Sequence, residues 1–155
     1  MITNATAGAL YRRRIENIMT YAELKKTRQA KYDALFDKVV LLWAFSESQF
    51  TEGKAKHPVT DGFKYTSIGS GGYFPGQNKQ AYIDGMDELN AWEKVASAQV
   101  KADAAESEKA ILYELNNYEA FYSGDLEEVV ALFEGTYTAE QIRKVYKKYV
   151  GSFEG

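Results

Sequence analysis

Apolar residues recur at helical intervals over most of the chain, and charged residues fill the positions between them. This pattern predicts amphipathic helices. Thr20 and Glu23 have the spacing of a capping box, which predicts a helix that continues to about Asp37. Thr138 and Gln141 form a second such box and predict the last helix of the chain.

Between these two helices, helical spacing resumes after Asn78, which we expect to be an N-cap, and ends near Gly124. One long helix, or two helices joined within residues 97–107, fits this stretch, because its middle is rich in strong helix formers. A further short helix is predicted from Asp125 to Gly135, where glycine can end it.

The exception to helical spacing is the stretch 39–75. Residues 39–45 are β-branched at the start and apolar throughout, which predicts a strand buried on both faces. Residues 63–68 alternate in polarity, and 73–75 are expected to return beside them as a hairpin. The glycine-rich residues 69–72 would form its turn. Three such strands, packed on helices, predict a small antiparallel sheet.

A brief helix is predicted between the first strand and the hairpin. Ser46 and Gln49 have the spacing of an N-cap and its partner three residues later. Gly53 and His57, which precedes a proline, indicate its end. Residues 59–62 then read as a turn, because Asp-Gly readily adopts the required backbone angles.

These elements predict an α+β fold, with a small antiparallel sheet of about three strands packed against about five or six helices. A length of 155 residues fits one domain. We expect residues 1–18 to form an N-terminal helical extension, 19–150 to form a single α+β domain, and 151–155 to form a tail.

The amino-acid composition excludes several kinds of functional site. The chain has no cysteine and one histidine, which excludes disulfides, thiol catalysis and zinc sites that need several histidines. No apolar run approaches about 20 residues, so no transmembrane helix is expected. The N-terminal sequence lacks the order of a signal peptide, and we expect a cytoplasmic protein without a cofactor or bound metal.

Charge is unevenly distributed along the chain. Residues 1–38 carry eight Lys or Arg against four Asp or Glu, whereas residues 100–155 carry six against eleven. Solvated helix faces explain much of this pattern. Alternatively, the basic residues form a patch that could meet phosphates, and its members are Arg12, Arg13, Arg14, Lys25, Lys26 and Arg28. The acidic C-terminal half could equally sit against a basic groove of a protein.

The candidate binding residues lie in the predicted strands, in the glycine turn and at the start of the short helix. They are Trp43, Phe45, Ser46, Gln49, Phe50, Tyr65, Ser67, Gly69, Gly71, Gly72, Tyr73 and Phe74. Core packing and a tight hairpin explain them structurally. Alternatively, the aromatic residues form a partner-binding surface.

A nucleotide site is a further interpretation of the same loop. Glycine N–H groups can cradle an anion, and nearby tyrosines can stack a base while Ser67 and Gln77 bond it. The loop lacks both the lysine of a P-loop and the spacing of a dinucleotide-binding motif.

Catalytic candidates are few. His57 could act as a general base, but no serine–acid arrangement is recognisable around it. Asp84 and Glu88 share a helix face and could bind a divalent cation, but two carboxylates are too few for a strong site. We therefore expect no catalytic residue, and an enzyme that uses Asp or Glu with a metal is the weakest alternative.

Several stretches are similar to one known family: residues 20–26 (TYAELKK), 44–53 (AFSESQFTEG), 67–74 (SIGSGGYF) and 113–119 (YELNNYE). They resemble a family of small uncharacterised domains encoded by bacteriophages and mobile elements, common in gut bacterial metagenomes. The resemblance covers about residues 19–132 and departs at Tyr118, where histidine is expected. It implies no activity, but it implies an accessory protein that acts on host machinery in the bacterial cytoplasm.

Two hypotheses follow. In the first, a non-catalytic phage or mobile-element protein binds, and is able to inhibit, a host protein such as a CRISPR-type defence nuclease complex. In the second, the loop of residues 67–77 binds a nucleotide or nucleotide signal. Nucleic acid is a further potential partner through the basic N-terminus, whereas a membrane partner is not expected.

Overall fold

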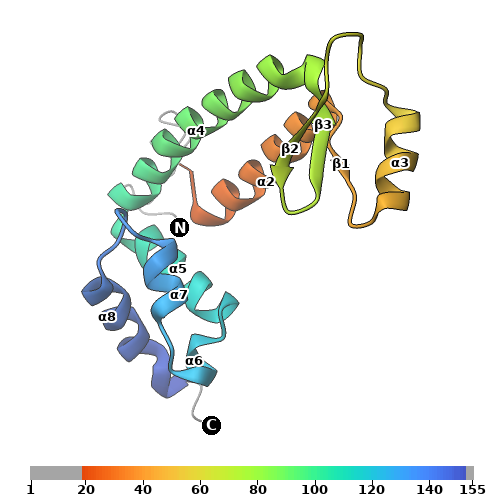
Figure 1. Ribbon diagram of the computed structural model, residues 1–155. Coiled ribbons are helices and arrows are strands. Elements are labelled where there is room, and N and C mark those ends of the chain that lie inside the picture. Colours follow the sequence, from red (N-terminus) through yellow and green to blue (C-terminus); the bar gives the residue numbers. More distant parts are fainter. Residues whose placement is uncertain (1–18, 153–155) are drawn as a thin grey trace, which may run out of the picture. The chain divides into compact units, whose positions relative to one another are not determined.

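The computed structural model describes residues 19–152, which form seven α-helices and one three-stranded sheet (Figure 1). The α+β fold predicted from the sequence is confirmed. In chain order the elements are α2 (Tyr21–Val39), β1 (Leu42–Trp43), α3 (Glu47–Lys56), β2 (Tyr65–Gly69), β3 (Gly72–Pro75), the 3-10 turn η1 (Gly76–Asn78), α4 (Lys79–Ala102), α5 (Ala104–Asn117), α6 (Ala120–Ser123), α7 (Glu127–Leu132), α8 (Ala139–Tyr149) and the 3-10 turn η2 (Val150–Ser152).

The chain divides into two compact units. Lys25–Val95 is one unit and holds the sheet, α3 and most of α2 and α4. The described part of the other unit consists of residues 19–24 and 96–152, and it holds α5 to α8. None of the described helices combines the length and the apolar character needed to span a bilayer.

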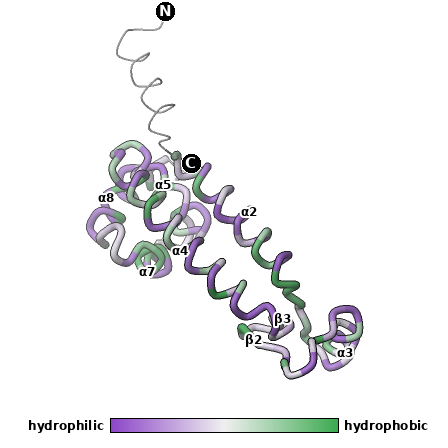
Figure 2. The backbone as a smooth tube through the Cα atoms, turned by 90° about the horizontal axis from the view of Figure 1, so that it is seen from above, coloured by the Kyte–Doolittle hydropathy of each residue, from purple (hydrophilic) through white to green (hydrophobic). Residues whose placement is uncertain are grey.

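The end of α2 differs from the prediction of a strand that begins at Val39. The helix continues to Val39, which is fully buried, and closes with a Schellman motif. The Leu41 amide donates to the Phe36 carbonyl (2.9 Å), the Val40 amide donates to the Asp37 carbonyl (3.2 Å), and Val40 has a φ of 59°. The hydrophobic residues at this end of the helix run on into β1 (Figure 2). Burial of Val39 on the helix therefore wins over its β-propensity.

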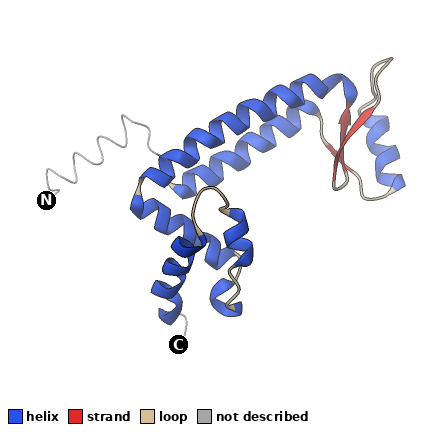
Figure 3. Ribbon diagram, turned by 60° about the vertical axis from the view of Figure 1, so that its left-hand side comes forward, coloured by secondary structure: helices blue, strands red, loops and turns tan. Residues whose placement is uncertain are grey.

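The predicted antiparallel sheet is present (Figure 3). Its strand order is β1–β3–β2. Leu42 pairs with Tyr73, and Thr66 pairs with Phe74. The ladder between β2 and β3 is irregular between Ser67 and Gly69. β1 is only two residues long, because the helical end of α2 takes up the start of the predicted strand.

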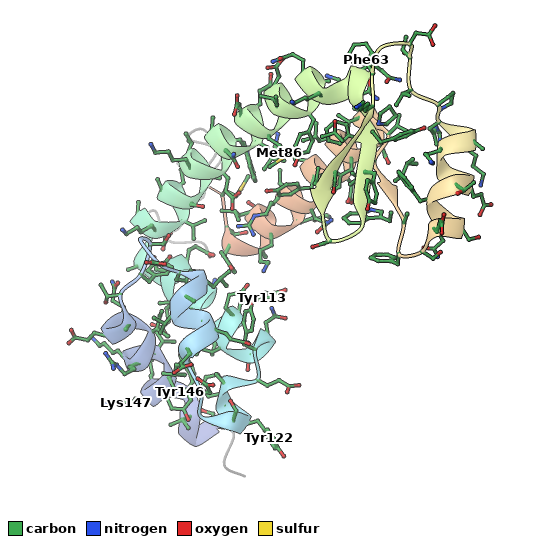
Figure 4. The ribbon with its side chains drawn as sticks, viewed as in Figure 1. Phe63, Met86, Tyr113, Tyr122, Tyr146 and Lys147 are labelled. Carbon is green, nitrogen blue, oxygen red and sulfur yellow. The ribbon has the colours of Figure 1, made fainter. Side chains whose placement is uncertain are left out.

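The core of this unit is formed by Leu35, Val39 and Phe74. Met86 of α4 packs against this cluster (Figure 4). Gly85 lets α4 approach α2 closely, because a Cβ at this position would clash with Leu35 Cδ1 and lie 3.2 Å from Leu35 Cγ.

The side chains of Asn78 and Asp103 form hydrogen bonds at two of the predicted helix boundaries in the middle of the chain. Asn78, the predicted N-cap, is the last residue of η1 and directly precedes α4, and its side-chain amide donates to the Val39 carbonyl (2.9 Å). Asp103 separates α4 from α5: its carboxylate accepts from the amides of Ala105 and Glu106 and caps α5. Of the two alternatives, two joined helices are therefore correct.

In the second unit, α5, α7 and α8 contribute the fully buried side chains Leu115, Val129 and Ile142. The capping box of Thr138 and Gln141 is present as predicted. The helix expected to reach Gly124 is interrupted, because Glu119 adopts a left-handed conformation between α5 and α6 (φ 55°).

Both capping groups predicted at the start of α2 also form. The Glu23 amide donates to the Thr20 hydroxyl, and the Thr20 amide donates to the Glu23 carboxylate (both 3.1 Å). This reciprocal arrangement satisfies two backbone donors that the helix itself leaves free.

Candidate functional site

Trp43 and Phe45 form an exposed aromatic surface, which we call the Trp43–Phe45 surface. The Trp43 residue is 52% exposed and Phe45 is 76% exposed. The prediction of a strand buried on both faces is therefore wrong. Leu42 contacts α3 at Gly53, where a Cβ would be 3.3 Å from Leu42 Cδ1. Neighbouring side chains of a strand point to opposite faces, so Trp43 points away from α3. Its ring packs nearly perpendicular to the ring of Phe36, with 6.5 Å between the ring centroids.

Phe45 is held in place by the backbone and by the glycine turn. Its amide donates to the Gln49 side-chain oxygen (2.8 Å), and the preceding Ala44 amide donates to the Gly71 carbonyl (2.8 Å). The Phe45 ring lies directly over Gly71, because a Cβ there would come within 2.8 Å of Phe45 Cε1. Gly71 also has a φ of 85°, which side chains rarely tolerate. The glycine turn therefore provides the surface on which the exposed Phe45 ring packs.

Ser46 and Gln49 position this surface from the N-terminus of α3. The Ser46 hydroxyl accepts from the Gln49 amide (3.2 Å), as predicted for an N-cap. The Gln49 side chain bonds the Phe45 amide rather than that of Ser46, so the cap also fixes the residue before it. The helix ends at His57 as predicted, whereas Gly53 lies within it.

The predicted binding residues Phe50, Tyr65 and Tyr73 form an aromatic cluster in which the rings pack on one another. The Phe50 ring lies 4.6 Å from that of Tyr73 and 5.7 Å from that of Tyr65, measured between centroids. The Tyr65 hydroxyl donates to the carbonyl of His57 (2.5 Å) and lies 3.2 Å from that of Lys54. This cluster ties α3 to the hairpin.

Gly72 and Phe74 are structural. Gly72 is buried, and a Cβ there would be 2.7 Å from Ile68 Cγ1 and 3.2 Å from Trp43 Cζ3. Trp43 therefore lies close to the hairpin backbone. Phe74 is fully buried in the core, 4.9 Å from the ring of Tyr82. Phe74 is therefore a core residue and not part of the Trp43–Phe45 surface.

The polar groups assigned to nucleotide recognition make internal bonds. The Ser67 hydroxyl accepts from the Gly69 amide (3.1 Å). The Gln77 side chain accepts from the Thr60 amide and donates to the Pro58 carbonyl (both 3.3 Å). These contacts hold the turn and the preceding loop in place.

The candidate basic patch is described only in part. Arg12, Arg13 and Arg14 lie outside the described residues. On α2, Lys26 is exposed and Lys25 is half-buried. The Arg28 guanidinium forms an ion pair with Glu93 of α4 (2.5 Å), so its charge has a partner within the same unit.

The candidate catalytic residue His57 and the candidate metal ligands Asp84 and Glu88 are not part of the Trp43–Phe45 surface. The Asp84 carboxylate accepts a hydrogen bond from the Gln80 side chain (2.8 Å). Among residues 19–152, no group of three potential metal-ligating side chains comes together. His57 is exposed and contributes its backbone to the end of α3.

The sequence analysis missed two polar clusters in the second unit. Tyr21 donates from its hydroxyl to the fully buried Glu114 carboxylate (2.8 Å) and from its amide to buried Glu106 (3.1 Å). On the surface, Glu108 accepts hydrogen bonds from Lys148 (2.7 Å) and Tyr149. These bonds lower the pKa of Glu108 and raise the pKa of Lys148 and of Tyr149. Sequence spacing carries no signal for contacts between residues this far apart.

These features define a small α+β protein with a solvent-facing aromatic surface. The chain belongs to DUF7659, a family of unknown function, which matches residues 20–152. The resemblance to a family of uncharacterised domains is confirmed to this extent. No curated protein and no solved structure matched the sequence.

Proposed function

We propose that the protein is a non-catalytic accessory protein of a phage or mobile element, and that it binds a host protein through the Trp43–Phe45 surface. The observation that carries this proposal is the 76% exposure of a phenylalanine whose backbone is fixed on both sides. A large apolar ring held in water is costly unless a partner covers it.

The geometry favours binding because the surface is already ordered. Phe45 is fixed by Gln49 and by its seat on Gly71, and Trp43 packs against Phe36. A partner would therefore immobilise few additional side chains on association, which reduces the entropic cost. A few well-packed residues supply most of the binding energy in protein interfaces, and tryptophan is enriched among them.

The kind of partner follows from the resemblance stated above. Accessory proteins of phages act on host machinery, and a nuclease-containing defence complex is our candidate partner. Binding to such a complex would inhibit it if the surface covers a substrate groove or an assembly contact.

The test is affinity capture from a bacterial lysate with the full chain and two variants. Trp43→Ala combined with Phe45→Ala should abolish capture of any partner that the native chain retains. Tyr122→Ala is the matched control, because Tyr122 is 94% exposed and projects from α6 (Figure 4). For a purified partner, loss of either ring alone should weaken binding by about 30-fold or more, since a hot-spot residue contributes about 2 kcal/mol or more, and loss of both rings should weaken binding further. Equal capture by the native chain and the double variant would contradict the proposal.

A nucleotide screen separates this proposal from the alternative function. A nucleotide present at 100 times its dissociation constant would stabilise the protein by about 2.7 kcal/mol. We expect no shift in melting temperature with mono-, di- or cyclic nucleotides. A shift that Ser67→Ala or Gln77→Ala removes, without unfolding the protein, would favour the nucleotide hypothesis instead.

A further inference from the structure

A groove between α5 and α8 is a second candidate interaction surface, in the unit that does not contain Trp43. It has a volume of about 540 Å³. α8 contributes Gln141, Lys144, Val145 and Lys148, which repeat at intervals of three and four residues. The groove therefore follows about two turns of this helix, or about 10 Å along its axis.

The floor of the groove is apolar. Ile111 of α5 is buried beneath it, Val145 of α8 is half-buried, and Ala104 of α5 is exposed. A ligand that fills the groove must therefore supply apolar side chains, because polar groups would lose hydration without gaining a bond.

The rim is positively charged. Lys101 and Lys144 form no ion pair with any residue of the described chain, whereas Lys148 pairs with Glu108. Glu108 is the one acidic residue of the groove lining, and it also accepts a hydrogen bond from Tyr149. The Glu108 carboxylate is therefore already paired within the protein. Two lysines are thus left to interact with a ligand.

The uncharged polar groups of the groove are mostly engaged or are donors. The Tyr137 hydroxyl donates to Ser107 (2.9 Å), and the Ser107 hydroxyl in turn bonds the Lys101 carbonyl (3.1 Å). The Gln141 side-chain oxygen accepts from the Thr138 amide (2.8 Å), which leaves its NH2 group for a ligand. A rim of donors fits carboxylate groups.

The acidic residues around the groove limit the classes of ligand that it can bind. Residues 96–152 carry ten Asp or Glu against six Lys or Arg, and residues 110–142 contain no Lys or Arg. A nucleic acid, whose charge extends well beyond the groove, would be repelled by this acidic unit. A short peptide can instead place its carboxylates against the lysines alone.

We propose that this groove binds an acidic amphipathic segment of a partner protein, with apolar side chains on the floor and Asp or Glu against Lys101 and Lys144. This inference goes beyond the proposed function, because it concerns a different surface and a second contact. An amphipathic helix laid in a groove is a common mode of peptide recognition.

Fluorescence anisotropy with the full chain tests the proposal. The probe is a labelled peptide of about 14 residues made of leucine, glutamine and two glutamates, with the leucines at helical spacing and both glutamates in the central two turns. We expect binding in the micromolar range at low salt, and at least fivefold weaker binding of the glutamine–leucine counterpart. Binding should also weaken as ionic strength rises, because the lysines are exposed to solvent.

Two variants of α8 with the same change of charge locate the site. Lys144→Glu should weaken binding at least fivefold, whereas Lys147→Glu, an exposed position outside the groove lining, should change it less than twofold. Circular dichroism will show that both variants are folded. Equal weakening by the two variants, no binding at millimolar peptide, or tighter binding of a single-stranded oligonucleotide that Lys144→Glu also removes would each overturn the proposal.

Discussion

α2 and α4 approach closely at Gly85. We therefore predict that Gly85→Ala destabilises the protein when Leu35 is present and stabilises it when Leu35 is replaced by alanine. Replacing a helical glycine by alanine normally stabilises a helix by about 1 kcal/mol. At Gly85 the new methyl group would clash with Leu35, which is buried in the core of Lys25–Val95. Overpacking of a core costs about 1–3 kcal/mol, so Gly85→Ala should destabilise the protein by about 1 kcal/mol net.

Removing Leu35 should reverse this result. Leu35→Ala alone should cost about 2–5 kcal/mol, because it leaves a cavity. In that background the methyl group of Gly85→Ala has room, and only the gain in helix propensity remains. Gly85→Ala should then stabilise by up to about 1 kcal/mol, which gives a coupling free energy of about 2 kcal/mol between the two positions.

Urea unfolding followed by tryptophan fluorescence is a suitable assay. The chain has two tryptophans, Trp43 and Trp92, and both lie in the unit that contains Gly85 and Leu35. Asn90→Ala, at an exposed position of α4, is the control and should give the same small gain in both backgrounds. If Gly85→Ala stabilises equally with and without Leu35, the inferred close packing of the helices is wrong.

Three further predictions concern backbone strain and buried or paired charges. Val40 has a left-handed conformation, so Val40→Gly should be more stable than Val40→Ala by about 1 kcal/mol in the same urea assay; the reverse order would refute the strain. Tyr21→Phe should cost about 1–3 kcal/mol by far-ultraviolet circular dichroism, because buried Glu114 loses a donor, whereas Tyr118→Phe, at an exposed position, should have little effect. Hydrogen bonds lower the pKa of Glu108, so the stability they contribute is present above the unfolded pKa of about 4.3 and is lost as pH falls through the folded value. The difference in melting temperature between the native chain and Glu108→Gln should therefore shrink between about pH 6 and pH 3, and a constant difference would contradict the assignment.

Local signals in the sequence were sufficient to predict much of the fold. Thr20, Ser46 and Thr138 begin their helices as predicted, because a cap depends on residues at most three positions away. The sheet was predictable because the hairpin combines alternating polarity with a glycine turn. Val39 was misassigned because its burial against Phe74, a contact across the unit, outweighs its local preference.

The candidate site could be predicted only in outline. The sequence brought Phe45, Gln49 and Gly71 into one set, and the structure shows how a hydrogen bond and a close contact join them. It did not indicate that Phe45 is exposed while Phe74 is buried, since both are aromatic residues near a predicted strand. That difference depends on position in the sheet: Phe45 lies beyond the end of β1, whereas Phe74 lies in the central strand β3. Local periodicity does not encode the order of the strands.

The brevity of the sheet has a consequence for how the protein behaves at high concentration. Both outer strands offer little continuous backbone to a neighbouring molecule, since β1 spans Leu42–Trp43 and β2 is irregular near its end. Sheets with short or distorted borders resist strand-by-strand growth into aggregates. Such borders allow the molecule to display bare aromatic rings beside its sheet without recruiting further copies of itself into fibrils.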